Sequence, residues 1–142
     1  MTADREEVEA LVAGMLHGID TLDWTGVRDA FADRVRVDYS SIFGGEAEVL
    51  DPDVLLERWR GLLPGFEATQ HLVGPVVLTR STGREVTAET PARGYHHIAG
   101  AAGGAVWMAA GRYVFELERG STSWRIMGLT FHLAYQEGNL DL

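Results

Sequence analysis

Two histidines, His71 and His96, lie where a pair of imidazoles could carry out acid–base chemistry. An apolar run from His71 to Leu78 is followed by the turn-forming residues 81–83 and then by alternation from Val86 to His97. This pattern predicts a long β-hairpin. Strand geometry places both histidines at the same end of the hairpin, within about 10 Å along the strand axis. Histidine titrates near neutral pH, so such a pair could move protons.

The return arm of this hairpin has an inner face of small side chains. Residues at period two share that face: Val86, Ala88, Thr90, Ala92, Gly94 and His96. Small inward residues leave a hollow unless a large side chain fills it from across the core. We therefore expect a pocket with the two imidazoles near its rim.

Other elements must position this hairpin. Apolar spacing and capping residues predict helices over residues 4–20, 23–31 and 51–63, and a strand over residues 35–39. After a glycine- and alanine-rich loop at 99–104, a second hairpin is expected from 105–118 and 123–135. Three helices cannot cover both faces of such a sheet. We expect an α+β fold: a cone-shaped, curved, mostly antiparallel sheet with three N-terminal helices packed on its concave face.

Composition limits the class of protein and its partners. The chain of 142 residues is interpreted as a single domain, residues 1–142. Its net charge of −9 and the absence of any Lys/Arg cluster argue against nucleic acid and membranes as partners. The N-terminus does not resemble a signal peptide, and no apolar run reaches membrane-spanning length. A cytoplasmic protein is therefore expected.

Patterns typical of metals and cofactors do not occur. There is no cysteine and no compact ligand spacing such as H-x-x-x-H, so we expect no metal site. No glycine-rich phosphate motif follows a strand, so we expect no nucleotide or other cofactor. The outer sheet face is expected to be too apolar for free exposure, which predicts a homodimer, with a trimer as the alternative. The outward candidates are Val106, Met108, Val114, Met127, Leu129 and Leu133.

Five short motifs, in this order, carry a resemblance to a known family. They are Asp20-Thr21-Leu22-Asp23-Trp24, Arg36-Val37-Asp38-Tyr39-Ser40-Ser41, Thr69-Gln70-His71-Leu72-Val73-Gly74, the Arg93…His96 spacing, and Trp124-Arg125-Ile126-Met127-Gly128-Leu129. With the expected element order, the chain resembles the SnoaL-like, nuclear transport factor-like cone fold, also called cystatin-like. The motifs are similar to those of its scytalone dehydratase branch.

The resemblance implies a set of catalytic residues. The family's site aspartate corresponds to Asp20, one of its two tyrosines to Tyr39, and its two histidines to His71 and His96. Its second tyrosine is replaced here by Ile19. A family Ser/Asn pair falls within residues 109–113, where neither residue type occurs. The same substrate is therefore not expected to fit.

The function implied is that of a cofactor-free lyase, a dehydratase of secondary metabolism acting on a small, hydrophobic, oxygenated ring compound. Dehydration beside a carbonyl needs a base, an acid and a group that stabilises the enolate. The histidines suit the first two roles, Tyr39 the third, and Asp20 could orient either imidazole. A SnoaL-like polyketide cyclase or isomerase is the alternative within enzymes, and a non-catalytic small-molecule-binding domain is the alternative outside them.

Further side chains are expected to form the pocket wall and bind substrate. These are Ile19, Trp24, Ile42, Trp59, Trp107 and Phe131. The other histidines, His17, His97 and His132, are interpreted as structural, although His132 shares its expected strand face with Gly128 and Thr130. Arg93 is interpreted as a surface residue.

Overall fold

The computed structural model describes residues 2–142, and Met1 lies outside the described residues. Over this range the helices are α1 (Thr2–Asp20), α2 (Trp24–Asp29), α3 (Ser40–Phe43) and α4 (Pro52–Leu62), with a 3₁₀ turn at Leu63–Gly65. The strands are β1 (Phe31–Asp38), β2 (Glu48–Leu50), β3 (Ala68–Val73), β4 (Val77–Ser81), β5 (Glu85–His97), β6 (Val106–Arg119) and β7 (Trp124–Gly138).

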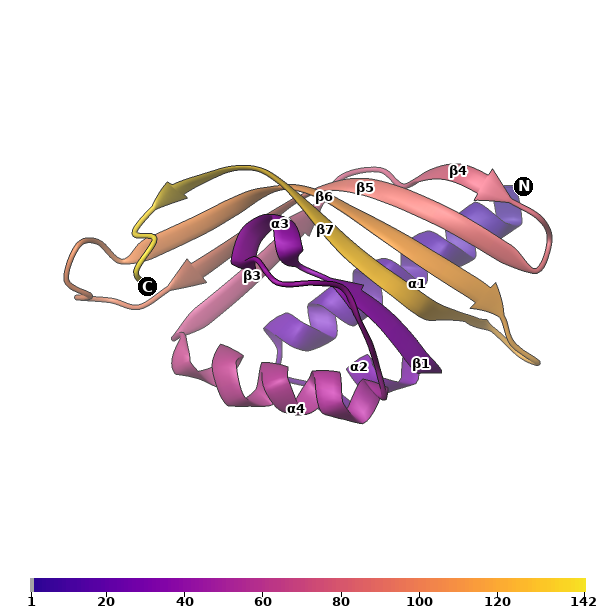
Figure 1. Ribbon diagram of the computed structural model, residues 1–142, viewed down its shortest axis with the longest axis horizontal. Helices are drawn as coiled ribbons and strands as arrows, with labels where there is room; N and C mark the ends of the chain where they lie inside the picture. The colour runs from indigo at the N-terminus through magenta and orange to yellow at the C-terminus, as the bar shows by residue number, and fades with distance from the viewer. Residues whose placement is uncertain (1) are drawn as a thin grey trace.

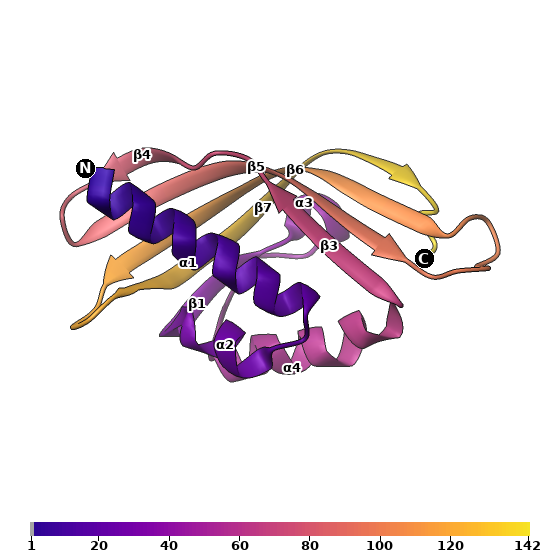
Figure 2. The ribbon, with the colours of Figure 1, turned by 180° about the vertical axis from the view of Figure 1, so that it is seen from behind.

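All seven strands form one curved sheet in the order β2-β1-β7-β6-β5-β3, and β4 also pairs with β5. The pairing of β1 with β7 is parallel, and the other pairings are antiparallel. Helices α1, α2 and α4 lie beneath the arch of the sheet (Figure 1). From behind, α1 crosses the concave side of the sheet, with α2 and α4 below it (Figure 2). The predicted α+β cone with a mostly antiparallel sheet is confirmed.

The predicted number of helices was wrong, because the structure has four over residues 2–142 rather than three. Helix α3 was missed because it is only four residues long, too short to show helical periodicity. It has no side-chain cap at Tyr39 and ends at Gly44, whose φ of 75° favours glycine. This short turn nevertheless places Ile42 and Phe43 in the wall of the interior cavity.

Helices α2 and α4 follow their capping signals closely, and α1 does not. Asp23 caps α2 by accepting a hydrogen bond from the Gly26 N–H, and Asp51 caps α4 with Pro52 at its first position. Helix α1 begins two residues before Asp4, so Asp4 lies in the first turn instead of capping it. Its carboxylate pairs with Arg119, 2.5 Å away, and ties α1 to the end of β6.

The first arm of the central hairpin is divided into β3 and β4. Between them, Gly74 and Pro75 leave the sheet; the Gly74 N–H donates to the Pro91 carbonyl, and the Thr90 hydroxyl donates to the Gly74 carbonyl. Proline cannot donate to a strand ladder, which explains a break at this point. Both pieces still pair with β5, so the hairpin expected from the sequence is preserved.

A β-bulge at Met127 changes which face of β7 looks inward. Leu117 pairs with Ile126 and Glu116 with Gly128, so Met127 has no partner on β6. The extra residue shifts the alternation by one. Leu129 and Leu133 consequently pack toward the core, and their predicted position on the outer face was wrong. His132 alternates with them and lies on the outer face.

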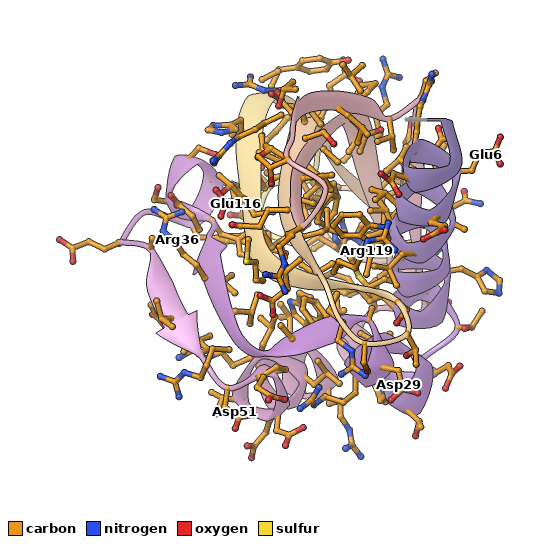
Figure 3. All side chains as sticks on the ribbon, turned by 90° about the vertical axis from the view of Figure 1, so that its right-hand side faces the viewer. Glu6, Asp29, Arg36, Asp51, Glu116 and Arg119 are labelled. Atoms are coloured by element: carbon orange, nitrogen blue, oxygen red, sulfur yellow. The ribbon has the colours of Figure 1, made fainter. Side chains whose placement is uncertain are left out.

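The concave face and the helices enclose the core. Val86, Ala88, Thr90, Ala92 and His96 of β5 are all buried, as the period-two pattern predicted. Seen from the side, side chains fill the space between α1 and the sheet, with Arg119 next to α1 and Glu116 on the other side of the sheet (Figure 3). Among the described helices, none has the length and apolar character needed to cross a bilayer.

Candidate functional site

A cavity of about 150 Å³ lies between the concave sheet and the helices. Its wall is mostly apolar, and its polar groups come from two tyrosines, two histidines and the indole N–H groups of two tryptophans. The lining residues are Met15, Leu16, Ile19, Tyr39, Ile42, Phe43, Trp59, Leu62, Leu63, Phe66, His71, Gly94, His96, Trp107, Ala109, Tyr113, Leu129 and Phe131. An apolar cavity with few convergent polar groups is typical of a small-molecule site.

Asp20 and His71 form a hydrogen-bonded pair at the edge of this cavity. Asp20 is the last residue of α1, and His71 lies in β3, which α1 crosses. His71 Nδ1 lies 2.7 Å from Asp20 Oδ1, and the His71 backbone N–H donates to Asp20 Oδ2, also at 2.7 Å. The Thr69 hydroxyl donates to Asp20 Oδ1 at 2.9 Å. The carboxylate is thus held by three donors.

These contacts define the charge of Asp20 and the tautomer of His71. Burial raises the pKa of the Asp20 carboxyl, but the hydrogen bonds from the His71 ring, the His71 backbone and Thr69 outweigh it, so the pKa lies below its usual value. Asp20 is therefore ionised near neutral pH and can only accept hydrogen bonds. His71 must carry its proton on Nδ1. In the neutral ring, Nε2 then presents a lone pair and can act as a base.

His96 lies in a different environment. Its ring stacks on Trp107 with centroids 4.1 Å apart and is close to Phe66 at 5.0 Å. Its Nδ1 lies 3.3 Å from the Trp107 carbonyl, which can only accept, so the proton is on Nδ1. Burial lowers the pKa of His96 to about 4, because the hydrogen bond to the Trp107 carbonyl and the charge of Asp20, which both favour the charged ring, do not offset the cost of burying it. His96 is neutral at pH 7.

The two imidazoles face each other across Gly94. Their centroids are 6.0 Å apart and the rings are nearly perpendicular. A β-carbon added at Gly94 would lie 3.4 Å from His71 Cδ2, 3.6 Å from His71 Nε2 and 3.5 Å from His96 Cε1. Glycine at this position keeps a space open between the rings, next to the nitrogen of His71 that can act as a base.

Tyr39 and Tyr113 supply the hydroxyl groups of the cavity. Tyr39 follows β1 and contacts the Phe43 ring at 6.0 Å. Tyr113 of β6 packs between Phe115 at 5.3 Å and Phe131 at 5.1 Å. Burial raises the pKa of both phenols well above the usual value, so both hydroxyls remain protonated donors.

The structure brings most of the expected residues to this site. Asp20 contacts His71 and not His96, which answers a question that the sequence left open. Tyr39, His71 and His96 line the cavity, as do Ile19, Ile42, Trp59, Trp107 and Phe131. Trp24 does not, and its predicted position was wrong. It begins α2, after the chain has turned away from the cavity, and lies beside a surface groove with Arg28 and Asp53.

Three residues of the site were not singled out from the sequence. Thr69 holds the Asp20 carboxylate, Gly94 separates the histidines, and Tyr113 adds a second phenol. Gly94 was placed on the inner face of its strand but was given no role in the site, and Tyr113 falls on an inward position of β6, so the period-two pattern could have identified it as well. Arg93 is exposed and donates to the Tyr135 hydroxyl on the outer face.

The described residues contain no group of three or more His, Asp or Glu side chains arranged to hold a metal ion. His71 Nδ1 is used by Asp20 and His96 Nδ1 by the Trp107 carbonyl, so each ring has only Nε2 available. In each ring, Nε2 is therefore the nitrogen that can bind a ligand or exchange a proton with it.

Comparison with known proteins assigns the fold to a family. Residues 1–130 match the model of the SnoaL-like domain. The chain belongs to the SnoaL-like domain family. No curated protein matches this SnoaL-like domain.

Solved structures share the architecture of this SnoaL-like domain at low identity. The protein Kfla4162 from Kribbella flavida has a TM-score of 0.90 at 23% identity, covering 96% of this chain and 94% of its own. A Novosphingobium aromaticivorans protein provisionally assigned as a scytalone dehydratase has a TM-score of 0.81 at 12% identity, covering 97% and 89%. The hexachlorocyclohexane dehydrochlorinase LinA-type3 from Novosphingobium barchaimii has a TM-score of 0.80 at 16% identity, covering 99% and 93%. These likenesses show the fold.

Proposed function

We propose that this SnoaL-like domain is a cofactor-free lyase that removes water from a small, hydrophobic, oxygenated ring compound. The Asp20–His71 pair at the edge of an apolar cavity carries the proposal, because it presents an oriented base to a bound substrate. Two structural neighbours are named for eliminations, one provisionally as a scytalone dehydratase and the other as a dehydrochlorinase, which also supports the proposal.

His71 performs the first proton transfer in this proposal. Its Nε2 takes a proton from the carbon beside a carbonyl, and the electrons of the broken C–H bond pass to the carbonyl oxygen to form an enolate. Tyr39 donates a hydrogen bond to that oxygen. Asp20 stabilises the imidazolium that results, because its carboxylate accepts the Nδ1 proton at 2.7 Å.

The same histidine completes the reaction. The enolate re-forms the carbonyl, the new C=C bond forms, and the neighbouring C–O bond breaks. The departing hydroxyl takes the proton from His71 Nε2 and leaves as water. His96 is a poor acid, because it is neutral and its N–H is directed at the Trp107 carbonyl. Its Nε2 instead accepts a hydrogen bond from the substrate hydroxyl and orients it. This differs from the division of acid and base roles expected from the sequence.

The test is a panel of cyclic β-hydroxy ketones, with loss of water followed by absorbance of the conjugated product. The wild-type protein should turn over at least one of them. His71→Ala should lower kcat by roughly 10²–10⁴-fold, the usual contribution of general acid–base catalysis, while the circular dichroism spectrum is unchanged. His17→Ala, which removes an exposed histidine of α1, is the matched control. Equal turnover by His71→Ala would contradict the proposal.

A proton-shuttling isomerase is the second candidate, and one observation favours it. A single oriented base can move a proton between two carbons of one substrate without a separate acid, and His71 is such a base. Reaction of unsaturated ketones in D₂O distinguishes the two candidates. An isomerase moves the double bond with no loss of water, whereas a lyase acts only on the hydroxy ketone.

A further inference from the structure

We propose that Tyr113 pairs with Tyr39 to form a two-hydroxyl site for a carbonyl or enolate oxygen, so that the ligand of this cavity is a ring ketone rather than a hydrocarbon or halocarbon. The inference rests on the proposed function in one respect, since it places the oxygen of the same substrate. Measurements of ligand binding, without any measurement of turnover, test it.

Tyr113 is a buried polar side chain whose hydroxyl has no partner. The residue is 7% exposed, and the structure gives its hydroxyl no hydrogen bond to any described residue. The hydroxyl is nevertheless not completely enclosed. Among the described residues, the fully buried side-chain polar atom that lacks a partner is Trp124 Nε1, and the Tyr113 hydroxyl does not meet that criterion. Tyr113 lines the cavity, so the cavity is the space that its hydroxyl can face.

Tyr39 is the second phenol of this kind, although it is half-buried where Tyr113 is buried. Its hydroxyl also has no hydrogen bond to a described residue, and its ring lines the cavity from the end of β1. Both phenols line the same cavity, and a charge on Tyr113 raises the pKa of Tyr39, after the larger effect of burial. Two protonated hydroxyls without partners therefore share one apolar space.

Such a pair has a defined ligand preference. A carbonyl oxygen has two lone pairs and can accept from two O–H donors at once, and an enolate accepts more strongly still. A hydrocarbon or a chlorinated ring would leave both hydroxyls unpaired in an apolar environment, which is unfavourable. The sequence-based expectation of a lone Tyr39 is thus extended, since the second phenol comes from β6 instead of the end of α1.

The experiment compares two probes of similar shape that differ in one non-hydrogen atom. Acetophenone carries a C=O group where α-methylstyrene carries C=CH₂. Binding is followed by the indole N–H NMR signals of Trp59 and Trp107, which line the cavity. The wild-type protein should prefer acetophenone. Tyr113→Phe and Tyr39→Phe should each weaken acetophenone binding by about 2- to 10-fold and leave α-methylstyrene binding unchanged.

Tyr135→Phe is the matched control, because Tyr135 lies on the outer face and should affect neither probe. Equal binding of both probes by the wild-type protein, or an unchanged preference in Tyr113→Phe, overturns the inference. Circular dichroism shows whether each variant is folded. If Tyr113→Phe does not fold, the inference is decided by Tyr39→Phe and by the preference of the wild-type protein for acetophenone over α-methylstyrene.

Different results would overturn the proposed lyase function and the two-hydroxyl site. If the wild-type protein prefers acetophenone through both tyrosines but dehydrates no hydroxy ketone, the oxygen site is supported and the lyase is not. If hydroxy ketones lose water while both tyrosine variants bind the probes like the wild type, the lyase is supported and the two-hydroxyl site is overturned.

Discussion

Asp20 binds His71 twice, through the ring at Nδ1 and through the backbone N–H, at 2.7 Å in each case. One carboxylate at the end of α1 therefore fixes both the tautomer of the imidazole and the position of the strand that carries it. The pair is well shielded, with the two side chains 11% and 16% exposed. Its geometry is set by the contact between the helix and the sheet.

Asp20→Asn should separate catalysis from binding. The asparagine amide can donate a hydrogen bond to His71 Nδ1, which would place the ring proton on Nε2 and remove the lone pair that faces the substrate. We expect kcat to fall by roughly 10²–10⁴-fold. Acetophenone affinity, measured by the same NMR titration, should change little. Asp29→Asn, at an exposed residue of α2, is the control. Full activity of Asp20→Asn would contradict the assignment.

His96 should make stability depend on pH. Its pKa is about 4 in the folded protein against 6.5 for an ordinary histidine. Between these values the unfolded chain binds a proton that the folded protein does not, so the stability rises with pH across this window and is lost as pH falls. The expected loss from pH 7 to pH 5 is about 2 kcal/mol.

Urea unfolding at the two pH values measures this effect. His96→Gln should reduce the pH dependence by that amount, and His17→Gln, at an exposed position, is the control. If His96→Gln retained the wild-type difference between pH 7 and pH 5, the neutral state of His96 would be ruled out as its source.

Gly94→Ala should fill the space between the two histidines. The new methyl would contact both rings at 3.4–3.6 Å, which are ordinary van der Waals distances, so the fold should persist. Turnover should fall because the methyl occupies the place of the reacting carbon. Gly14→Ala provides the matched control, since nothing lies within 4 Å of its added β-carbon. That variant should keep its activity and gain up to about 1 kcal/mol in stability from helix propensity. Steady-state kinetics and thermal unfolding of both variants check the prediction.

We also expect the protein to form a dimer through the outer face of the sheet. Leu72, Arg93, Ala110 and Tyr135 form a row across β3, β5, β6 and β7, in which Leu72 is 49% and Tyr135 44% exposed. Leu72→Lys should shift the sedimentation coefficient toward that of a monomer. Val49→Lys, at an exposed valine of β2, is the control. A monomeric wild-type protein at micromolar concentration would contradict the expectation, and a trimer would favour the alternative state.

Local signals accounted for much of the fold. Asp23, Asp51 and Pro52 predicted the starts of α2 and α4 correctly, because capping depends on residues close in sequence. The inner face of β5 followed from its alternation alone. The inner face of β7 did not, because the bulge at Met127 depends on how β7 pairs with β6. Helix α3 was too short to leave any periodic signal.

The candidate site was predicted in part for a similar reason. His71 and His96 could be placed together because they belong to one hairpin. The choice of His71 as the partner of Asp20 could not be made, since it depends on the angle at which α1 crosses β3. Tyr113 was not assigned to the site, although its inward position on β6 follows from period-two alternation. The position of Trp24 outside the cavity likewise depends on the turn after α1.

Met127, the extra residue of the bulge, affects the shape of the cavity through the number of residues in β7. A bulge bends its strand and increases the local twist. Deleting Met127 would leave Ile126 and Leu129 facing inward, because the remaining residues would alternate regularly, but it would flatten the sheet behind Leu129 and Phe131. The space available to a ligand can thus be altered by losing a single residue that does not line it, with every lining side chain retained.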